Sequence, residues 1–99
     1  MTNSDWEDRA ASRFPLHLDT PVLDMRTGRF LAGRSRDVSL NGVFIETHEQ
    51  PPIGALVDVF LGGVGIGAQV VGRVVRATPG DGFGVTFTGD TSGIQRMLS

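Results

Sequence analysis

Short runs in which apolar and polar residues alternate dominate this chain, and such alternation is typical of β-strands. The run GFGVTF is the clearest example, because Phe83, Val85 and Phe87 share one face and the residues between them share the other. In ALVDVFL both faces carry large apolar residues, which indicates a strand covered on both sides. Strands are expected near residues 15–23, 29–37, 42–47, 55–61, 67–78 and 82–88, in a sheet that closes on itself.

The connections between these strands contain the residues that turns require. RTGR at 26–29 and PGDG at 79–82 supply glycines for tight hairpins. EQPPIG at 49–54 has two prolines, which cannot donate hydrogen bonds to a sheet, so it is interpreted as a connection. LGGVGIGA at 61–68 lacks both the GxGxxG order and the GK[ST] ending of nucleotide-binding loops, which favours a hairpin connection.

A helical pattern occurs only near the C-terminus. Ser92 and Gln95 have the spacing of a capping box, and Ile94, Met97 and Leu98 lie on one helical face. Together with the strands, this pattern predicts an all-β fold, namely a six-stranded antiparallel β-barrel with a short C-terminal helix.

Residues 1–13 differ in composition from the rest of the chain. They are polar and acidic, with Trp6 as the only large apolar group, so we expect a flexible N-terminal arm before a domain at 14–99. The arm lacks the apolar core of a secretory signal, and no segment is long and apolar enough to cross a bilayer. We therefore expect a cytoplasmic location and no membrane partner.

Composition limits the classes of function. A chain of 99 residues with 39% hydrophobic content can form one compact domain. A net charge of -2 argues against binding a nucleic acid polymer over a broad basic face. All nine basic residues are Arg, which suits bidentate contacts to phosphate but is equally explained by a GC-rich genome.

Catalytic and metal-binding patterns find little support in this sequence. There is no Cys, which excludes thiolate metal sites and disulfides. His17 and His48 are the only histidines and lie far apart, so a metal site would need several carboxylates from separate strands. Ser39 has no GxSxG context and no evident His–Asp partner. We therefore expect no enzyme activity, no metal and no cofactor.

Two short patterns remain as candidates for a binding site. Arg9 and Arg13 form an RxxxR pair, which by itself is expected by chance in a chain with nine Arg. Asp37, Ser39 and Gly42 form a DxSxxG pattern, for which the frequencies of the three residue types predict only about 0.06 occurrences. The second pattern is therefore the more informative.

Strand geometry brings the two patterns together. If residues 15–37 form one hairpin, Arg13 lies opposite residues 40–42. The glycine there allows backbone N–H groups to form an anion nest, and the acid and hydroxyl can hydrogen-bond a base edge or a phosphate. The arginines offer bidentate contacts to phosphate and stack on a purine. Alternatively, the acid and hydroxyl cap a turn and the glycine marks a β-bulge.

In order and type, RxxxR followed by DxSxxG resembles the signature of the PilZ domain, a bacterial receptor module for cyclic di-GMP. The resemblance covers nearly the whole chain and implies a six-stranded barrel that holds the ligand between the arm and its outer surface. It implies that Arg9 and Arg13 bind phosphates and stack on guanine, that Asp37 and Ser39 hydrogen-bond the guanine edge, and that Gly42 leaves room for the ligand.

The resemblance also suggests weaker candidates and two departures from the family pattern. The weaker ligand-binding candidates are Asn41, Arg36, Arg34 and Arg76. Members that bind a stacked ligand dimer often have an Arg just before RxxxR, where this chain has Asp8. Many members place a bulky stacking side chain on a late strand, where this chain offers only Arg73 and Arg76.

Three functions follow from these patterns. The leading hypothesis is a cyclic di-GMP receptor that changes conformation and signals to an unidentified downstream protein in motility, biofilm or exopolysaccharide control. The second is a PilZ-like adaptor that binds a protein partner without nucleotide. The third, a small barrel that binds nucleic acid, predicts exposed aromatics on a basic groove, and this acidic chain has few aromatics to spare.

Overall fold

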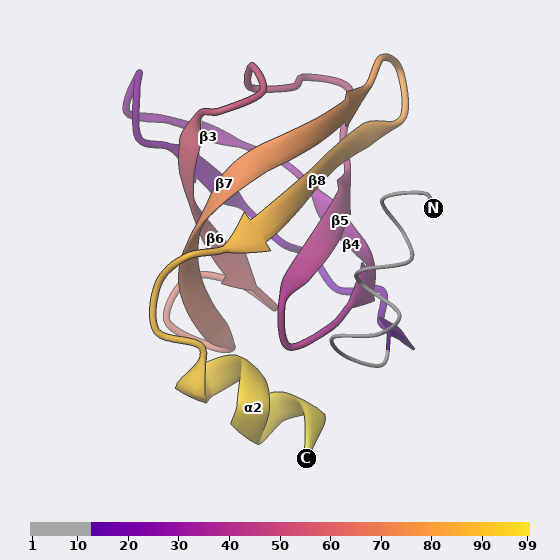
Figure 1. Cartoon of the computed structure of the whole chain (residues 1–99), viewed down its shortest axis with the longest axis vertical. Helices are drawn as coiled ribbons and strands as arrows, with labels where there is room; N and C mark the ends of the chain where they lie inside the picture. Colours follow the sequence, from indigo (N-terminus) through magenta and orange to yellow (C-terminus); the bar gives the residue numbers. More distant parts are fainter. Residues whose placement is uncertain (1–12) are drawn as a thin grey trace.

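The computed structural model describes residues 13–99, which form one antiparallel sheet followed by a helix (Figure 1). The all-β prediction is therefore confirmed. The elements are β1 (Phe14–Pro15), β2 (Val22–Asp24), β3 (Arg29–Leu31), β4 (Arg34–Val38), β5 (Gly42–Glu46), β6 (Leu56–Leu61), β7 (Ala68–Thr78), β8 (Gly82–Phe87) and α2 (Ser92–Leu98). The strand order is β1-β4-β5-β8-β7-β6-β2-β3.

The expected six-stranded closed barrel is wrong, because the sheet is open and has eight strands. Both of the first two expected strands, 15–23 and 29–37, are broken in two. The first segment changes partner along its length: the Thr20 amide donates to the carbonyl of Gly33 before β4, whereas the next carbonyl, that of Pro21, accepts from Phe60 in β6. Because the segment pairs first with β4 and then with β6, it cannot form one continuous strand against a single partner.

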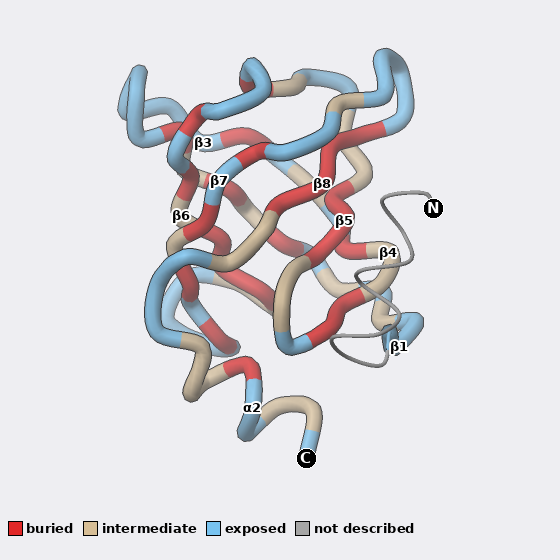
Figure 2. The backbone as a smooth tube through the Cα atoms, viewed as in Figure 1, coloured by how far each residue is buried: buried red, intermediate tan, exposed pale blue. Residues whose placement is uncertain are grey.

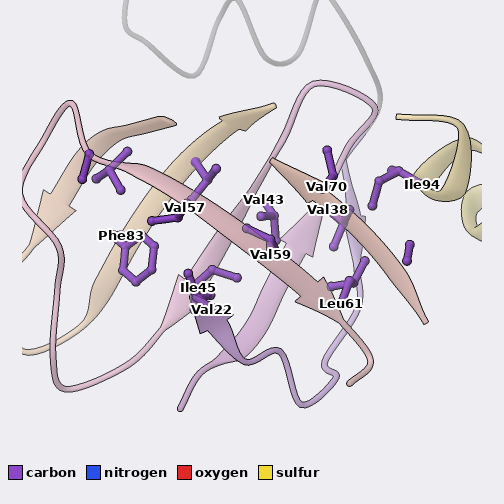
Figure 3. Close-up of a cluster of buried hydrophobic side chains, with 14 residues drawn as sticks. Val22, Val38, Val43, Ile45, Val57, Val59, Leu61, Val70, Phe83 and Ile94 are labelled. Atoms are coloured by element: carbon purple, nitrogen blue, oxygen red, sulfur yellow. The ribbon is translucent and has the colours of Figure 1, made fainter. Parts of the chain in front are cut away.

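The core lies on the concave side of the curved sheet (Figures 2 and 3). The predicted inward face of β8 is confirmed, since Phe83 and Val85 are buried and Phe87 packs partly against the core. On the outer face of β6, Phe60 is buried beside Phe30, with ring centroids 5.7 Å apart, but Leu56 is exposed. The expected burial of both faces of β6 is therefore found only near its C-terminal end, at Phe60.

The connections follow the expected pattern. Gly28 and Gly80 have φ angles of 74° and 79°, which suit glycine in the β2–β3 and β7–β8 turns. Residues 49–54 and 61–68 link β5 to β6 and β6 to β7, as predicted. Among the described residues, no helix is long and apolar enough to span a membrane.

Helix α2 packs at one end of the sheet, where it meets β7 (Figure 1). Its buried face begins at Ile94, as predicted from the apolar spacing. The predicted capping box is wrong, because Thr91 is the N-cap and makes no side-chain capping bond. Instead, Asp90 accepts hydrogen bonds of 3.0 Å from both the amide and the hydroxyl of Ser92. These bonds, the backbone one first, lower the pKa of Asp90 below its ordinary value.

Candidate ligand-binding site

A β-bulge in β4 separates Ser35, on the inner face of the sheet, from Asp37, on the outer face. Ser35 faces Ile45 in β5 and Asp37 faces Phe44, so Arg36 is an extra residue in the ladder. Without the bulge, Ser35 and Asp37 would lie on the same face, because successive side chains alternate. With it, Ser35 is fully buried, whereas the side chain of Asp37 is 20% exposed and faces outward.

The first motif meets the second at this position. Arg13 precedes β1, in which Phe14 faces Val38 of β4. The Nη2 of Arg13 donates a 2.9 Å hydrogen bond to Oδ2 of Asp37. The predicted meeting is thus confirmed, but the contact is with Asp37 and not opposite residues 40–42. The expected register assumed one regular hairpin, whereas both of its strands are interrupted.

Ser39 organises the turn between β4 and β5. It is 2% exposed, and its Oγ accepts hydrogen bonds of 3.1 Å from the amides of both Asn41 and Gly42. Its own amide donates to the carbonyl of Gly42 at 2.9 Å. The turn-capping interpretation therefore describes Ser39 in this structure, and its contact with a ligand stays a prediction.

Gly42 allows close approach of two strands. Its φ is not positive, and it pairs in register with Thr86 of β8. A Cβ at this position would lie 2.3 Å from the carbonyl oxygen of Val85. The bulge that was considered for Gly42 is located at Arg36 instead. The room that this glycine leaves is occupied by the backbone of β8.

Arg36, Phe44 and their neighbours form a network beside Asp37 that the sequence patterns did not indicate. Nε of Arg36 donates to Glu46 at 2.9 Å, and its Nη2 donates to Asp81 at 2.6 Å. The guanidinium also lies 4.3 Å from the centroid of the Phe44 ring, and that of Arg76 lies 5.5 Å from it. The pKa of Arg36 is raised, chiefly because the Glu46 carboxylate accepts its hydrogen bond.

A second bulge, in β7, brings Arg76 onto the same outer face. Arg76 faces Gly84 of β8, which is in turn paired with Phe44 of β5 and thereby with Asp37 of β4. Since partners across a ladder point to the same face, these four residues form a row across the sheet. Gly84 has no side chain, which leaves space for Arg76 to reach Phe44.

The other candidates lie at the margins of this row. Arg34 begins β4, and its Nη1 is 3.9 Å from the exposed carboxylate of Asp19. Arg73 donates at 2.6 Å to the carbonyl of Gly54 in the β5–β6 connection. Arg9, with the rest of residues 1–12, lies outside the described residues.

Next to the Arg36 network the surface is hollowed. The hollow has a volume of about 320 Å³ and is lined by Ala32, Gly33, Arg34, Glu46, Thr47, His48, Gly80 and Asp81. Neither Arg13 nor Asp37 lines this hollow. Within residues 13–99, no group of three or more His, Asp or Glu could hold a metal ion.

An all-β domain with an accessible arginine–aspartate pair and outward-facing cations has the features of a small binding module. Comparison with protein-family models matches residues 7–99 to the PilZ domain. The chain belongs to the PilZ domain family. PilZ domains are binding and receptor domains, and cyclic di-GMP binding is the usual role of the family. A comparison with curated proteins found no match.

Proposed function

We propose that this chain is a non-catalytic receptor for cyclic di-GMP that signals to a partner protein in the bacterial cytoplasm. Family membership supports this function, since the matched residues contain both motifs. The observation that carries the proposal is the contact between Arg13 and Asp37, one residue from each motif, on the outer face of the sheet.

The chemistry of this pair fits the ligand. Arg13 can make bidentate, charge-assisted hydrogen bonds to a phosphate. The Asp37 carboxylate can accept from N1–H and the exocyclic amine of guanine, a donor pair that adenine does not present. Cyclic di-GMP has both groups, so it offers a phosphate to Arg13 and a pair of neutral N–H donors to Asp37, which can replace the ion pair between them.

The free energies of these interactions favour replacing the Arg13–Asp37 ion pair with contacts to the ligand. Arg13 and Asp37 are 32% and 20% exposed, and an ion pair near the surface contributes only about 0.2–1 kcal/mol. Each charge-assisted hydrogen bond to the ligand contributes about 1.5–3 kcal/mol. The ion pair therefore orients the two side chains in the free protein without preventing the ligand from separating them.

The remaining motif residues have supporting roles in this proposal. Arg9 binds the phosphates of the ligand together with Arg13, as the RxxxR pattern implies. Ser39 and Gly42 shape the loop that follows Asp37. A change of conformation on binding passes the signal to a downstream protein that acts in motility, biofilm or exopolysaccharide control.

Isothermal titration with cyclic di-GMP tests the proposal. The wild-type chain is expected to bind, and Arg13→Ala is expected to lower the affinity about 10- to 150-fold, which corresponds to the loss of 1.5–3 kcal/mol. Arg29→Ala is the matched control, because Arg29 also forms an exposed ion pair, with Glu49 at 3.2 Å. Absence of binding by the wild-type chain, or equal effects of the two variants, would contradict the proposal.

A second titration tests the assignment of Asp37. Asp37→Ala should lower the affinity for cyclic di-GMP and narrow its preference over cyclic di-AMP, because the carboxylate is the group that reads the guanine edge. If the variant keeps the wild-type preference, Asp37 does not contact the base.

A protein-binding adaptor without nucleotide is the second candidate. An apolar hollow of about 540 Å³ favours it, lined in part by Phe30 and Val64, which are 54% and 56% exposed. The same wild-type titration separates the two functions, because an adaptor of this kind shows no heat of cyclic di-GMP binding.

A further inference from the structure

The β4 bulge ends at Asp37, which faces outward beside buried Val38 while Ser35 stays inside, so whatever holds the bulge also fixes the backbone that carries the carboxylate. On the inner side, the Ser35 hydroxyl accepts from the amide of Leu18 at 3.0 Å and donates to the carbonyl of Leu16. On the outer side, Arg36 is the residue that the bulge adds to the strand. The two consecutive residues are thus fixed on opposite faces of the sheet.

The Arg36 side chain connects the bulge to two other segments. Its Nε bonds to Glu46 at the end of β5, its Nη2 bonds to Asp81 in the β7–β8 turn, and its plane lies over Phe44. Phe44 is also the residue that faces Asp37 across the ladder. These three contacts fix the orientation of the Arg36 side chain, so that it does not occupy the space of the Asp37 side chain.

We propose that Arg36 is a positioning residue for ligand binding, whose contacts with Glu46, Asp81 and Phe44 hold the β4 bulge and thereby direct the Asp37 carboxylate toward Arg13 and the ligand. This inference rests on the proposed function for its ligand and assigns Arg36 a different role from the direct contact considered at first. Its two carboxylate partners already occupy two of the guanidinium nitrogens.

Neutralising the two partners separates a positioning role from direct ligand contact. If Arg36 contacted the phosphate, Glu46→Gln combined with Asp81→Asn would release it from competing acceptors, and affinity would rise. If Arg36 positions Asp37, the same double variant loosens the bulge, and affinity falls. The two roles thus predict changes of opposite sign.

The binding experiment uses cyclic di-GMP titrations of the full chain. Arg36→Gln and the Glu46→Gln/Asp81→Asn double variant are each expected to lower the affinity about tenfold, the lower end of the loss seen when groups that orient metal-binding side chains are removed. Arg36→Lys should resemble Arg36→Gln, because one ammonium cannot span both carboxylates in the guanidinium geometry. Glu49→Gln is the matched control for loss of an exposed, ion-paired carboxylate and should leave affinity unchanged.

A measurement without ligand keeps the inference testable if the proposed function fails. In Arg36→Gln, backbone amides of residues 36–38 should exchange with solvent at least about tenfold faster than in the wild type, while β6 and β7 keep their protection. If amides 36–38 of Arg36→Gln exchange at the wild-type rate and the Asp37 chemical shifts are unchanged, the positioning role is overturned. A higher affinity of the double variant for cyclic di-GMP would also overturn it. Faster exchange in a chain that binds no cyclic di-GMP would support the positioning of Asp37 and overturn the proposed function.

Discussion

Replacing Gly42 by Ala tests whether this motif glycine serves the ligand or the sheet. The added Cβ would lie 2.3 Å from the Val85 carbonyl oxygen, whereas ordinary contacts begin at 3.4 Å. Strands β5 and β8 would have to separate by about 1 Å at this point, and steric insertions of this size typically destabilise by about 1–3 kcal/mol. The smaller entropy of alanine in the unfolded chain offsets only about 0.5–1 kcal/mol of that loss.

The measurement is thermal unfolding followed by circular dichroism. In a domain of this size, 1 kcal/mol corresponds to about 4–8 °C in Tm, so a central net loss of about 1.25 kcal/mol should lower the Tm of Gly42→Ala by roughly 5–10 °C. Gly84→Ala is the matched control on the same outer face, because its nearest atoms are those of the Arg76 side chain at 3.7 and 3.8 Å. Its Tm should be unchanged or slightly higher.

The two interpretations of Gly42 predict changes in different measured properties, affinity in one case and stability in the other. If the glycine only leaves room for the ligand, Gly42→Ala loses affinity and keeps its Tm. If it leaves room for β8, stability falls whether or not ligand is present. Equal melting temperatures for Gly42→Ala and Gly84→Ala would refute the steric reasoning.

Two further predictions concern the β4–β5 turn and the start of α2. Ser39→Ala should lower the free energy of unfolding by about 1–3 kcal/mol in urea titrations, because the amides of Asn41 and Gly42 lose a buried acceptor; an unchanged midpoint would contradict this role. The pKa of Asp90 is lowered in the folded state, so its bonds to Ser92 stabilise the helix start above pH 3.8 and are lost as pH falls from 3.8 through the folded pKa. Ser92 amide shifts followed by NMR should show this transition, and Asp90→Asn should abolish it.

Local features of the sequence predicted much of the fold. The faces of β8, the hairpin at Gly28 and the apolar face of α2 depend on neighbouring residues alone, and the structure confirms each. The helix cap was not predictable from spacing, because Asp90 and Thr91 compete with Ser92 for the same role. Which of them is the N-cap depends on where the chain leaves β8.

The number of strands depended on information that no local pattern contains. Residues 15–23 have continuous strand character, yet their first half bonds to β4 and their second half to β6. Gly33 marks the corresponding break in the second segment, since a Cβ there would lie 2.5 Å from a side-chain atom of Ile45. Such close approach arises from the curvature of the whole sheet, so it follows from tertiary structure and not from alternation.

The candidate site depends on register even more than on the motif. Strict alternation in RSRDV would put Ser35 and Val38 on opposite faces, yet both residues are fully buried. Both conditions hold only if one extra residue lies between Ser35 and Val38, which is the position of Arg36 in the bulge. The buried hydroxyl of Ser35 is satisfied by backbone groups, so placing it inward carries no unsatisfied polar group. Asp37 faces outward because it is next to Val38, whose burial the apolar pattern predicts. The burial of Ser35, which requires the bulge, is not signalled by its polar side chain.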